Sequence, residues 1–219
     1  MNKEEASQLI KSTGALLEGH FVLTSGKHSG IYINKDMVSS VPSVLSSLAK
    51  EIAFDFLKRR EDVEVIAAPA IGAIPLGNWV AYYISRERGR DVSSIYAEEV
   101  NGEFQFDRTY EAFITVGTRV LIVEDVITTG KTIRLMLDLV QRLDGTVVGV
   151  GVLWNRSQEN LDLEIPLYTL VTRSLPVFDP QNCQLCQEQI RVDIRVGHGQ
   201  KFLDNYGTDP KKWPANRES

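Results

Sequence analysis

Two adjacent carboxylates, Glu124 and Asp125, follow directly after the apolar run Val120–Val123. A short turn comes next and leads into a helical pattern; its polar and small residues are Thr128, Thr129, Gly130, Lys131 and Thr132. The start of a helix presents backbone N–H groups without partners, and the helix dipole there favours an anion. Together with the threonine hydroxyls and the charge of Lys131, these groups predict a phosphate-binding turn.

The two carboxylates require an explanation of their own, because they repel a bound anion. A ligand that also carries vicinal hydroxyls, or that develops positive charge during a reaction, would explain them. A ribose 5-phosphate that reacts through an oxocarbenium-like transition state has both properties. The alternative is that Glu124 and Asp125 only cap a loop and that the threonines are ordinary N-cap residues. A Walker A motif is excluded, because Asp125 stands where that motif requires its first glycine.

The elements that position these residues follow an alternating pattern. Strands are predicted over Val63–Ala67, Val92–Tyr96, Arg119–Val123, Val147–Leu153 and Leu167–Val171. Helices are predicted from Pro42 to about Phe56, after Gly72 to about Glu87, and over about Lys131–Leu143. This alternation predicts an α/β fold with a doubly wound, mostly parallel sheet flanked by helices. Ligands in such sheets bind beyond the carboxyl ends of the strands, where the acid pair lies.

The two ends of the chain are less regular. A weakly amphipathic pattern predicts a helix over Lys3–Leu17, followed by a small hairpin. The hairpin would consist of His20–Leu23, the turn Ser25–Lys27 and Ile31–Ile33. We expect His20 and His28 on the surface of this hairpin, and the polar tail after Gly197 as a loosely held extension.

Composition narrows the classes of function. The 219 residues suit one domain, and 24 Lys+Arg against 29 Asp+Glu give a net charge of −5. A chain with this net negative charge is not expected to bind nucleic acid. It has no apolar run of about 18 residues, so we expect no membrane span. The polar, acidic first residues differ from a signal peptide, and two cysteines suit a reducing compartment, so we expect a cytoplasmic protein.

Glu124-Asp125 and the turn Thr128–Thr132 behind an apolar strand resemble the phosphoribosyl-pyrophosphate (PRPP) signature of type I phosphoribosyltransferases. More narrowly, roughly residues 1–197 resemble the orotate phosphoribosyltransferase family. The supporting matches are Phe21–Ser29 with Tyr32 and Asn34, Ala68–Ala73, and Cys183-Gln-Leu-Cys186. The resemblance implies the type I fold over a single domain, residues 1–219. About 1–40 and 173–197 would form a small hood, and 198–219 a C-terminal extension.

The resemblance also implies the roles of the site residues. Thr128–Thr132 would hold the 5-phosphate, and Glu124 and Asp125 would contact the ribose hydroxyls. The turn Ala70, Ile71, Gly72 and Ala73 would bind pyrophosphate through backbone N–H groups, unless it serves only strand–helix packing. Mg²⁺ would be held mainly by PRPP, with Asp125 as the one protein residue offered to it.

For the base, the resemblance points to Arg156, whose planar guanidinium suits the carboxylate of orotate. Tyr32 would stack on the base, although a tyrosine in a hairpin is as often part of a core. A solvent-facing arginine remains the alternative for Arg156. The implied reaction is Mg²⁺-dependent transfer of ribose 5-phosphate from PRPP to orotate, giving orotidine 5′-monophosphate and pyrophosphate. The alternatives are transfer to another nucleobase and a regulator that senses PRPP without turning it over.

Several features depart from the family pattern. Many orotate enzymes carry a mobile basic loop where this chain has the acidic stretch Tyr96–Arg108, and lysines at the places of Thr24 and Gly72. The remaining candidate cations are Lys27, Lys35, Arg108 and Lys131. The resemblance implies a homodimer in which the stretch Glu98–Arg108 of one chain closes over the site of the other, with Arg108 as its catalytic contact.

The two cysteines form a single Cys-x-x-Cys pair, Cys183 and Cys186. A structural zinc site needs about four ligands, and His198 alone cannot complete one. We therefore expect local packing or weak metal affinity from this pair.

Overall fold

The computed structural model describes residues 1, 3–157, 161, 163–172 and 175–216. The chain divides into two compact units. The core unit comprises Met1–Thr13 and Lys35–Ser174, and the second unit comprises Gly14–Asn34 and Leu175–Ser219. The single domain with a hood that the resemblance implies stays a prediction.

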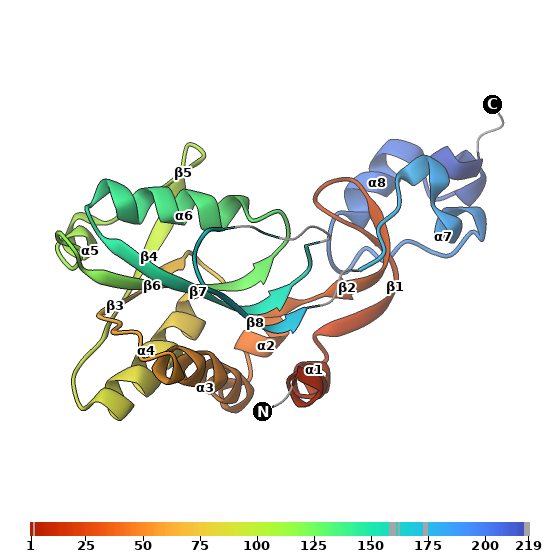
Figure 1. Cartoon of the computed structure of the whole chain (residues 1–219). Helices are drawn as coiled ribbons and strands as arrows, with labels where there is room; N and C mark the ends of the chain where they lie inside the picture. The colour runs from red at the N-terminus through yellow and green to blue at the C-terminus, as the bar shows by residue number, and fades with distance from the viewer. Residues whose placement is uncertain (2, 158–160, 162, 173–174, 217–219) are drawn as a thin grey trace. The chain divides into compact units, whose positions relative to one another are not determined.

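The core unit contains a six-stranded sheet with the order β5-β4-β3-β6-β7-β8 (Figure 1). The strands are β3 (Val65–Pro69), β4 (Ser93–Val100), β5 (Glu103–Phe106), β6 (Arg119–Ile127), β7 (Thr146–Asn155) and β8 (Leu167–Thr172). All neighbouring pairs are parallel except β4 and β5, which form an antiparallel hairpin at one edge. The predicted doubly wound, mostly parallel sheet is therefore confirmed.

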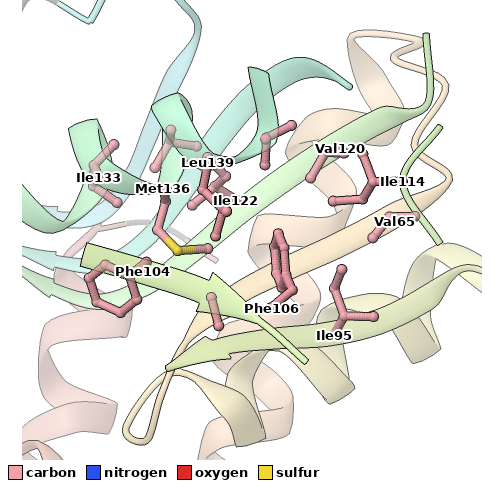
Figure 2. Packing of buried hydrophobic residues seen from close by; sticks show 14 of the residues in the cluster. Val65, Ile95, Phe104, Phe106, Ile114, Val120, Ile122, Ile133, Met136 and Leu139 are labelled. Atoms are coloured by element: carbon pink, nitrogen blue, oxygen red, sulfur yellow. The ribbon is translucent and has the colours of Figure 1, made fainter. Parts of the chain in front are cut away.

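Helices cover both faces of the sheet (Figure 1). On one face, α3 (Pro42–Lys58) and α4 (Ile74–Arg88) pack together and onto the strands. On the other face, α6 (Lys131–Arg142) packs on β5, β6 and β7, and Ile133 and Met136 of the helix belong to the same buried cluster as Ile122 of β6 (Figure 2). The shorter helices are α1 (Lys3–Ser12), α2 (Lys35–Ser39) and α5 (Arg108–Glu111). None of the helices within the described residues combines the length and the apolar character that crossing a bilayer requires.

The first helix is shorter than the predicted Lys3–Leu17. Helix α1 ends at Ser12, and Gly14 adopts a φ of +74°, a conformation that ends helices and that glycine adopts without strain. Leu16–Glu18 then pair with Ile31–Ile33 instead of continuing the helix. The apolar residues at the end of the helical pattern therefore belong to a strand.

The acidic stretch that stands where many orotate enzymes carry a mobile loop forms a β-hairpin. Strand β4 continues to Val100 and pairs with β5 around a turn in which Asn101 and Gly102 have φ values of +53° and +87°. An Asn-Gly pair with both φ positive is typical of the tight turns that match the twist of a hairpin. Phe104 and Phe106 then insert into the core beneath α6 (Figure 2). Their burial anchors this stretch to the sheet.

The second unit is built on the antiparallel pair β1 (Leu16–Val22) and β2 (His28–Ile33), which confirms the predicted hairpin. Its C-terminal part contains α7 (Gln184–Gln187), α8 (Gly199–Tyr206) and the short 3₁₀ turns η1 (Pro180–Asn182), η2 (Pro210–Lys212) and η3 (Pro214–Asn216). The expectation of a loosely held tail is wrong up to Asn216. Phe202 and Trp213 are buried in a cluster with Cys183 and Cys186, because their large aromatic rings supply much of the apolar surface of this small unit.

The expectation that His20 and His28 lie on the hairpin surface is also wrong. Both side chains are fully buried. The C-terminal segment covers them, since the backbone N–H of His28 donates to Phe178 O and the N–H of Asp193 donates to His20 O, each at 2.8 Å.

Candidate functional site

The acid pair lies near the end of β6, in the core unit. Glu124 and Asp125 are only 7% and 5% exposed, although carboxylates are usually found at the surface. Glu124 pairs in register with Val152 of β7, so the buried sheet itself fixes the position of the pair. Two carboxylates held in fixed positions near the end of a strand can bind a polar or positively charged ligand.

The threonine turn connects β6 directly to α6. Gly130 has a φ of +76°, so a side chain at this position would be strained, and the helix begins at Lys131. The hydroxyl of Thr129 accepts a hydrogen bond from the N–H of Lys131 at 3.4 Å. Thr128 and Thr129 are exposed at this helix start. The turn therefore presents hydroxyls and the first N–H groups of a helix outward, as a bound phosphate requires.

Lys35 supplies positive charge to the acid pair. Its Nζ atom lies 2.8 Å from Oδ2 of Asp125, and the lysine is the first residue of α2. Burial alone would lower the pKa of Lys35, but the charge of Asp125 and the hydrogen bond to it outweigh burial and leave that pKa raised. Lys35 is therefore a firmly charged ammonium beside Asp125.

Glu124 has a different environment from Asp125. Burial, followed by the neighbouring charge of Asp125, raises the pKa of Glu124 well above its ordinary value. One of its oxygens, Oε1, accepts the backbone N–H of Asp125 at 3.0 Å. Glu124 therefore holds its proton more tightly than an exposed glutamate does.

The predicted pyrophosphate turn lies beside the acid pair. It follows β3, the parallel neighbour of β6, and the N–H of Ala70 donates to Ala97 O at 2.8 Å. The Ala70–Ile71 peptide bond is cis, and the Ile71 side chain is 82% exposed. A Cβ atom placed on Gly72 would clash with Oδ2 of Asp125 and Nζ of Lys35. The turn and the acid pair therefore share one small space.

Arg156 is at the same edge of the sheet. Its backbone N–H donates to the carbonyl of Ile127, the last residue of β6, at 2.8 Å. The preceding Asn155 is buried, and its Oδ1 accepts both the N–H of Ser157 at 2.9 Å and the Ser157 hydroxyl at 2.6 Å. These bonds fix the chain on either side of Arg156, next to the threonine turn.

Three predicted residues belong to other elements of the chain. Lys27 and Tyr32 belong to the second unit, where Lys27 Nζ is 3.7 Å from Asp179 Oδ1 and the Tyr32 ring lies 5.5 Å from that of Phe21. Arg108 begins α5 and lines a surface hollow of about 600 Å³. The described lining of this hollow comes from 96–110 and does not include the acid pair.

Sequence reasoning missed two contacts of this site. Lys35 was only one of four candidate cations, and nothing in its spacing links it to Asp125. Arg134, on the first turn of α6, donates from Nη1 to the carbonyl of Thr129 at 3.0 Å and so braces the threonine turn. This contact spans five residues, so the i,i+3 and i,i+4 spacings of a helix do not indicate it.

The arrangement can bind a phosphorylated sugar. The helix start offers donors to a phosphate, and the acid pair offers acceptors to hydroxyls, with the ammonium of Lys35 beside it. Carboxylate oxygens are also the ligands that Mg²⁺ prefers, so Asp125 fits a role beside a magnesium ion that the substrate itself carries.

Comparison with known proteins agrees with this chemistry. Residues 38–182 match the family described as "Phosphoribosyl transferase domain". The orotate phosphoribosyltransferase of Caldicellulosiruptor bescii is 38% identical over 201 residues, which cover 92% of this chain and 100% of the relative. That of Thermotoga maritima is 34% identical over 194 residues, 89% of this chain and 98% of the relative.

Solved structures show the same fold. The orotate phosphoribosyltransferase from Aeropyrum pernix aligns with a TM-score of 0.59 at 24% identity, covering 76% of this chain and 92% of that one. An adenine phosphoribosyltransferase from Saccharomyces cerevisiae aligns with a TM-score of 0.58 at 16% identity, covering 76% and 99%. The family match covers residues 38–182, and the two orotate phosphoribosyltransferases align over nearly their full length. The chain therefore belongs to the phosphoribosyltransferases and, within them, to the orotate phosphoribosyltransferase family.

Proposed function

We propose that this protein transfers ribose 5-phosphate from PRPP to orotate, giving orotidine 5′-monophosphate and pyrophosphate, as a step of pyrimidine biosynthesis. The observation that carries the proposal is the meeting of three features at one edge of the sheet. They are the buried acid pair, the threonine turn at the start of α6, and the Gly72 turn that abuts Asp125.

Each part of PRPP has a matching group. The 5-phosphate is held by the N–H groups and hydroxyls of Thr128–Thr132, where the helix dipole favours an anion. The hydroxyls of the ribose bind Glu124 and Asp125. The pyrophosphate lies at the turn Ala70–Ala73, whose small residues permit close approach to the backbone. Lys35 and Lys131 supply positive charge along this path.

The acid pair also accounts for catalysis. The reacting carbon of the ribose becomes positively charged as its bond to pyrophosphate breaks, and carboxylates fixed in a buried site stabilise such charge without reorganising. Mg²⁺, carried mainly by PRPP, neutralises the departing pyrophosphate when it is bound. Asp125 is the protein carboxylate that we assign to this ion, because it already pairs with the ammonium of Lys35 at 2.8 Å and can accept a second cation.

Arg156 is assigned to the base. A guanidinium can form two parallel hydrogen bonds with a carboxylate, and orotate carries a carboxylate that purines and uracil lack. The backbone bond from Arg156 to Ile127 supports this assignment, because it holds the residue beside the threonine turn. The family resemblance implies three further contacts, which we also propose. Lys27 would contact the pyrophosphate, Tyr32 would stack on the base, and Arg108 would contact the transition state.

We also propose a cytoplasmic homodimer. The two unpaired cysteines support a reducing compartment. The hollow beside Arg108 supports a docking role for the hairpin β4–β5, since its lining combines Tyr96 and Tyr110 with charged Glu98 and Arg108. This hairpin would cover the neighbouring chain's site as a rigid element, because Phe104 and Phe106 anchor it.

A panel of bases tests the proposed function. The full chain is incubated with PRPP, Mg²⁺ and orotate, uracil, adenine or hypoxanthine in turn, and the loss of each base is followed. We expect turnover of orotate alone. Turnover of another base without orotate would contradict the base assignment and leave PRPP chemistry in place. PRPP binding without turnover of any base would instead indicate a sensor.

A further inference from the structure

Four nitrogen and sulfur donors meet in the interior of the second unit. His20 comes from β1, His28 from β2, Cys183 from the end of η1, and Cys186 from α7. All four residues have 0% exposure, and their ligand atoms lie within 4.8 Å of one another. The acid pair and the threonine turn belong to the other unit, so the proposed reaction uses none of these residues.

The spacing of the donor atoms suits a tetrahedral metal ion. Nε2 of His20 is 2.9 Å from Nδ1 of His28, and Sγ of Cys186 is 3.3 Å from the same Nδ1. Sγ of Cys183 and Sγ of Cys186 lie 3.8 Å and 3.7 Å from Nε2 of His20. Around a zinc ion with Zn–N of about 2.0–2.1 Å and Zn–S of about 2.3 Å, neighbouring ligand atoms of a tetrahedron are roughly 3.3–3.8 Å apart. These four separations lie within about half an ångström of that tetrahedral spacing.

The His20 ring is oriented as a metal ligand requires. Nδ1 of His20 lies 2.7 Å from the carbonyl of Ile190, which can only accept, so Nδ1 carries the proton and Nε2 directs its lone pair into the cluster. Nε2 of His28 is buried without a hydrogen-bond partner among the described residues. The polar contacts of the His28 ring are therefore those of Nδ1, on the cluster side.

The surroundings of the cluster are apolar. The ring of Trp213 packs edge-on to His20 at 5.8 Å between centroids, and that of Phe202 packs on His28 at 4.7 Å. A dry shell with all four donors from protein leaves no open position, which is typical of structural rather than catalytic zinc. The imidazole nitrogens in such a shell are costly to bury without a partner, and a bound cation supplies one.

We propose that His20, His28, Cys183 and Cys186 bind one structural Zn²⁺ ion. The two cysteines supply two ligands, and the N-terminal hairpin supplies the other two through His20 and His28. His198 is exposed and is not a ligand. The ion fastens the hairpin to the C-terminal segment, reinforcing the backbone bonds of His28 with Phe178 and of Asp193 with His20. Its binding energy adds to the stability of the second unit.

Measuring the metal content tests the proposed zinc site independently of the enzymatic activity. The full chain, produced without a histidine tag in zinc-supplemented medium, is analysed by inductively coupled plasma mass spectrometry. We expect one zinc ion per chain. Replacement by Co²⁺ should give the intense ligand-field bands of a four-coordinate ion together with thiolate-to-cobalt charge transfer. Weak bands of an octahedral Co²⁺ without charge transfer would place the metal on oxygen ligands and overturn the proposal.

Variants identify the ligands. Cys183→Ser and His28→Gln should lose stoichiometric zinc, whereas His198→Gln, the third histidine, and Asp125→Asn, in the other unit, should keep it. If the ligand variants do not fold, the cobalt spectrum of the wild-type chain decides. Absence of zinc and cobalt binding in the folded wild-type chain, or a disulfide between Cys183 and Cys186 shown by intact mass, would contradict the site.

A chelator gives a further readout. Removal of the ion should lower the melting temperature of the wild-type chain and of His198→Gln, and re-addition of Zn²⁺ should restore it. An unchanged melting temperature in a sample shown to have lost its zinc would overturn the structural role of the ion.

Discussion

The ammonium of Lys35 lies 2.8 Å from Oδ2 of Asp125, and both groups fill the space that a side chain at position 72 would need. Many enzymes that this chain resembles have a lysine where it has Gly72. Here the positive charge beside the acid pair comes instead from α2, and the glycine leaves room for it.

Lys35→Ala should therefore raise the KM for PRPP by about 10-fold, because it removes a charged hydrogen-bond donor from the anion's path. Steady-state kinetics with varied PRPP measure this effect, with Lys11→Ala, an exposed lysine on α1, as the matched control. Adding Gly72→Lys to Lys35→Ala should not recover the loss, because a Cβ atom at position 72 still clashes with Oδ2 of Asp125. No effect of Lys35→Ala on either kinetic parameter would exclude Lys35 from the site.

Glu124→Gln should stabilise the free protein in a pH-dependent way. The raised pKa of Glu124 means that the folded state holds this proton more tightly than the unfolded state. The native contribution of Glu124 is therefore fully present below its ordinary pKa and is lost as the pH rises through the raised pKa. The free energy of unfolding of the variant should match that of wild type near pH 4 and exceed it increasingly at higher pH.

Urea titrations from pH 4 to 8 measure this difference, and Glu99→Gln, at an exposed position of β4, controls for the amide itself. A constant difference between Glu124→Gln and wild type across this range would show that burial does not perturb Glu124. Activity of the variant should fall at the same time, because the acid pair is assigned to the ribose.

Arg156→Lys should affect orotate more than PRPP. A lysine keeps the charge but cannot form the paired hydrogen bonds of a guanidinium, so the KM for orotate should rise about 10- to 100-fold with the KM for PRPP nearly unchanged. Arg86→Ala, on the exposed end of α4, serves as the control. Equal changes in both KM values would point to a structural role for Arg156.

The strands and the acid pair were predictable because their signals are local. The apolar run of β6, its carboxylates and the threonine turn are contiguous in the chain, and the alternation of strands and helices fixes which edge they share. The Lys35–Asp125 pair and the cluster of His20 with Cys186 join segments far apart in sequence, so neither spacing nor periodicity reports them. The burial of Phe104 and Phe106 beneath α6 depends on contacts between distant segments, so the sequence does not show how firmly the hairpin β4–β5 is held.

Subunit mixing tests the proposed dimer. Asp125→Asn and Arg108→Ala should each be poorly active alone. If the hairpin of one chain completes the site of the other, a mixture that has exchanged subunits should recover part of the activity, because each mixed dimer contains one intact site. No recovery in a mixture shown to have exchanged would place Arg108 in its own chain's site or outside catalysis.

The most direct test of the acid pair as the catalytic centre is turnover of orotate by Asp125→Asn, measured together with PRPP binding by calorimetry. We expect a loss of turnover of about 100-fold or more, as removal of fixed transition-state electrostatics produces, with much of the PRPP affinity retained. Asp138→Asn, an exposed acid on α6, should behave as wild type. Near-normal turnover by Asp125→Asn would contradict the account and leave the acid pair a structural feature of the sheet.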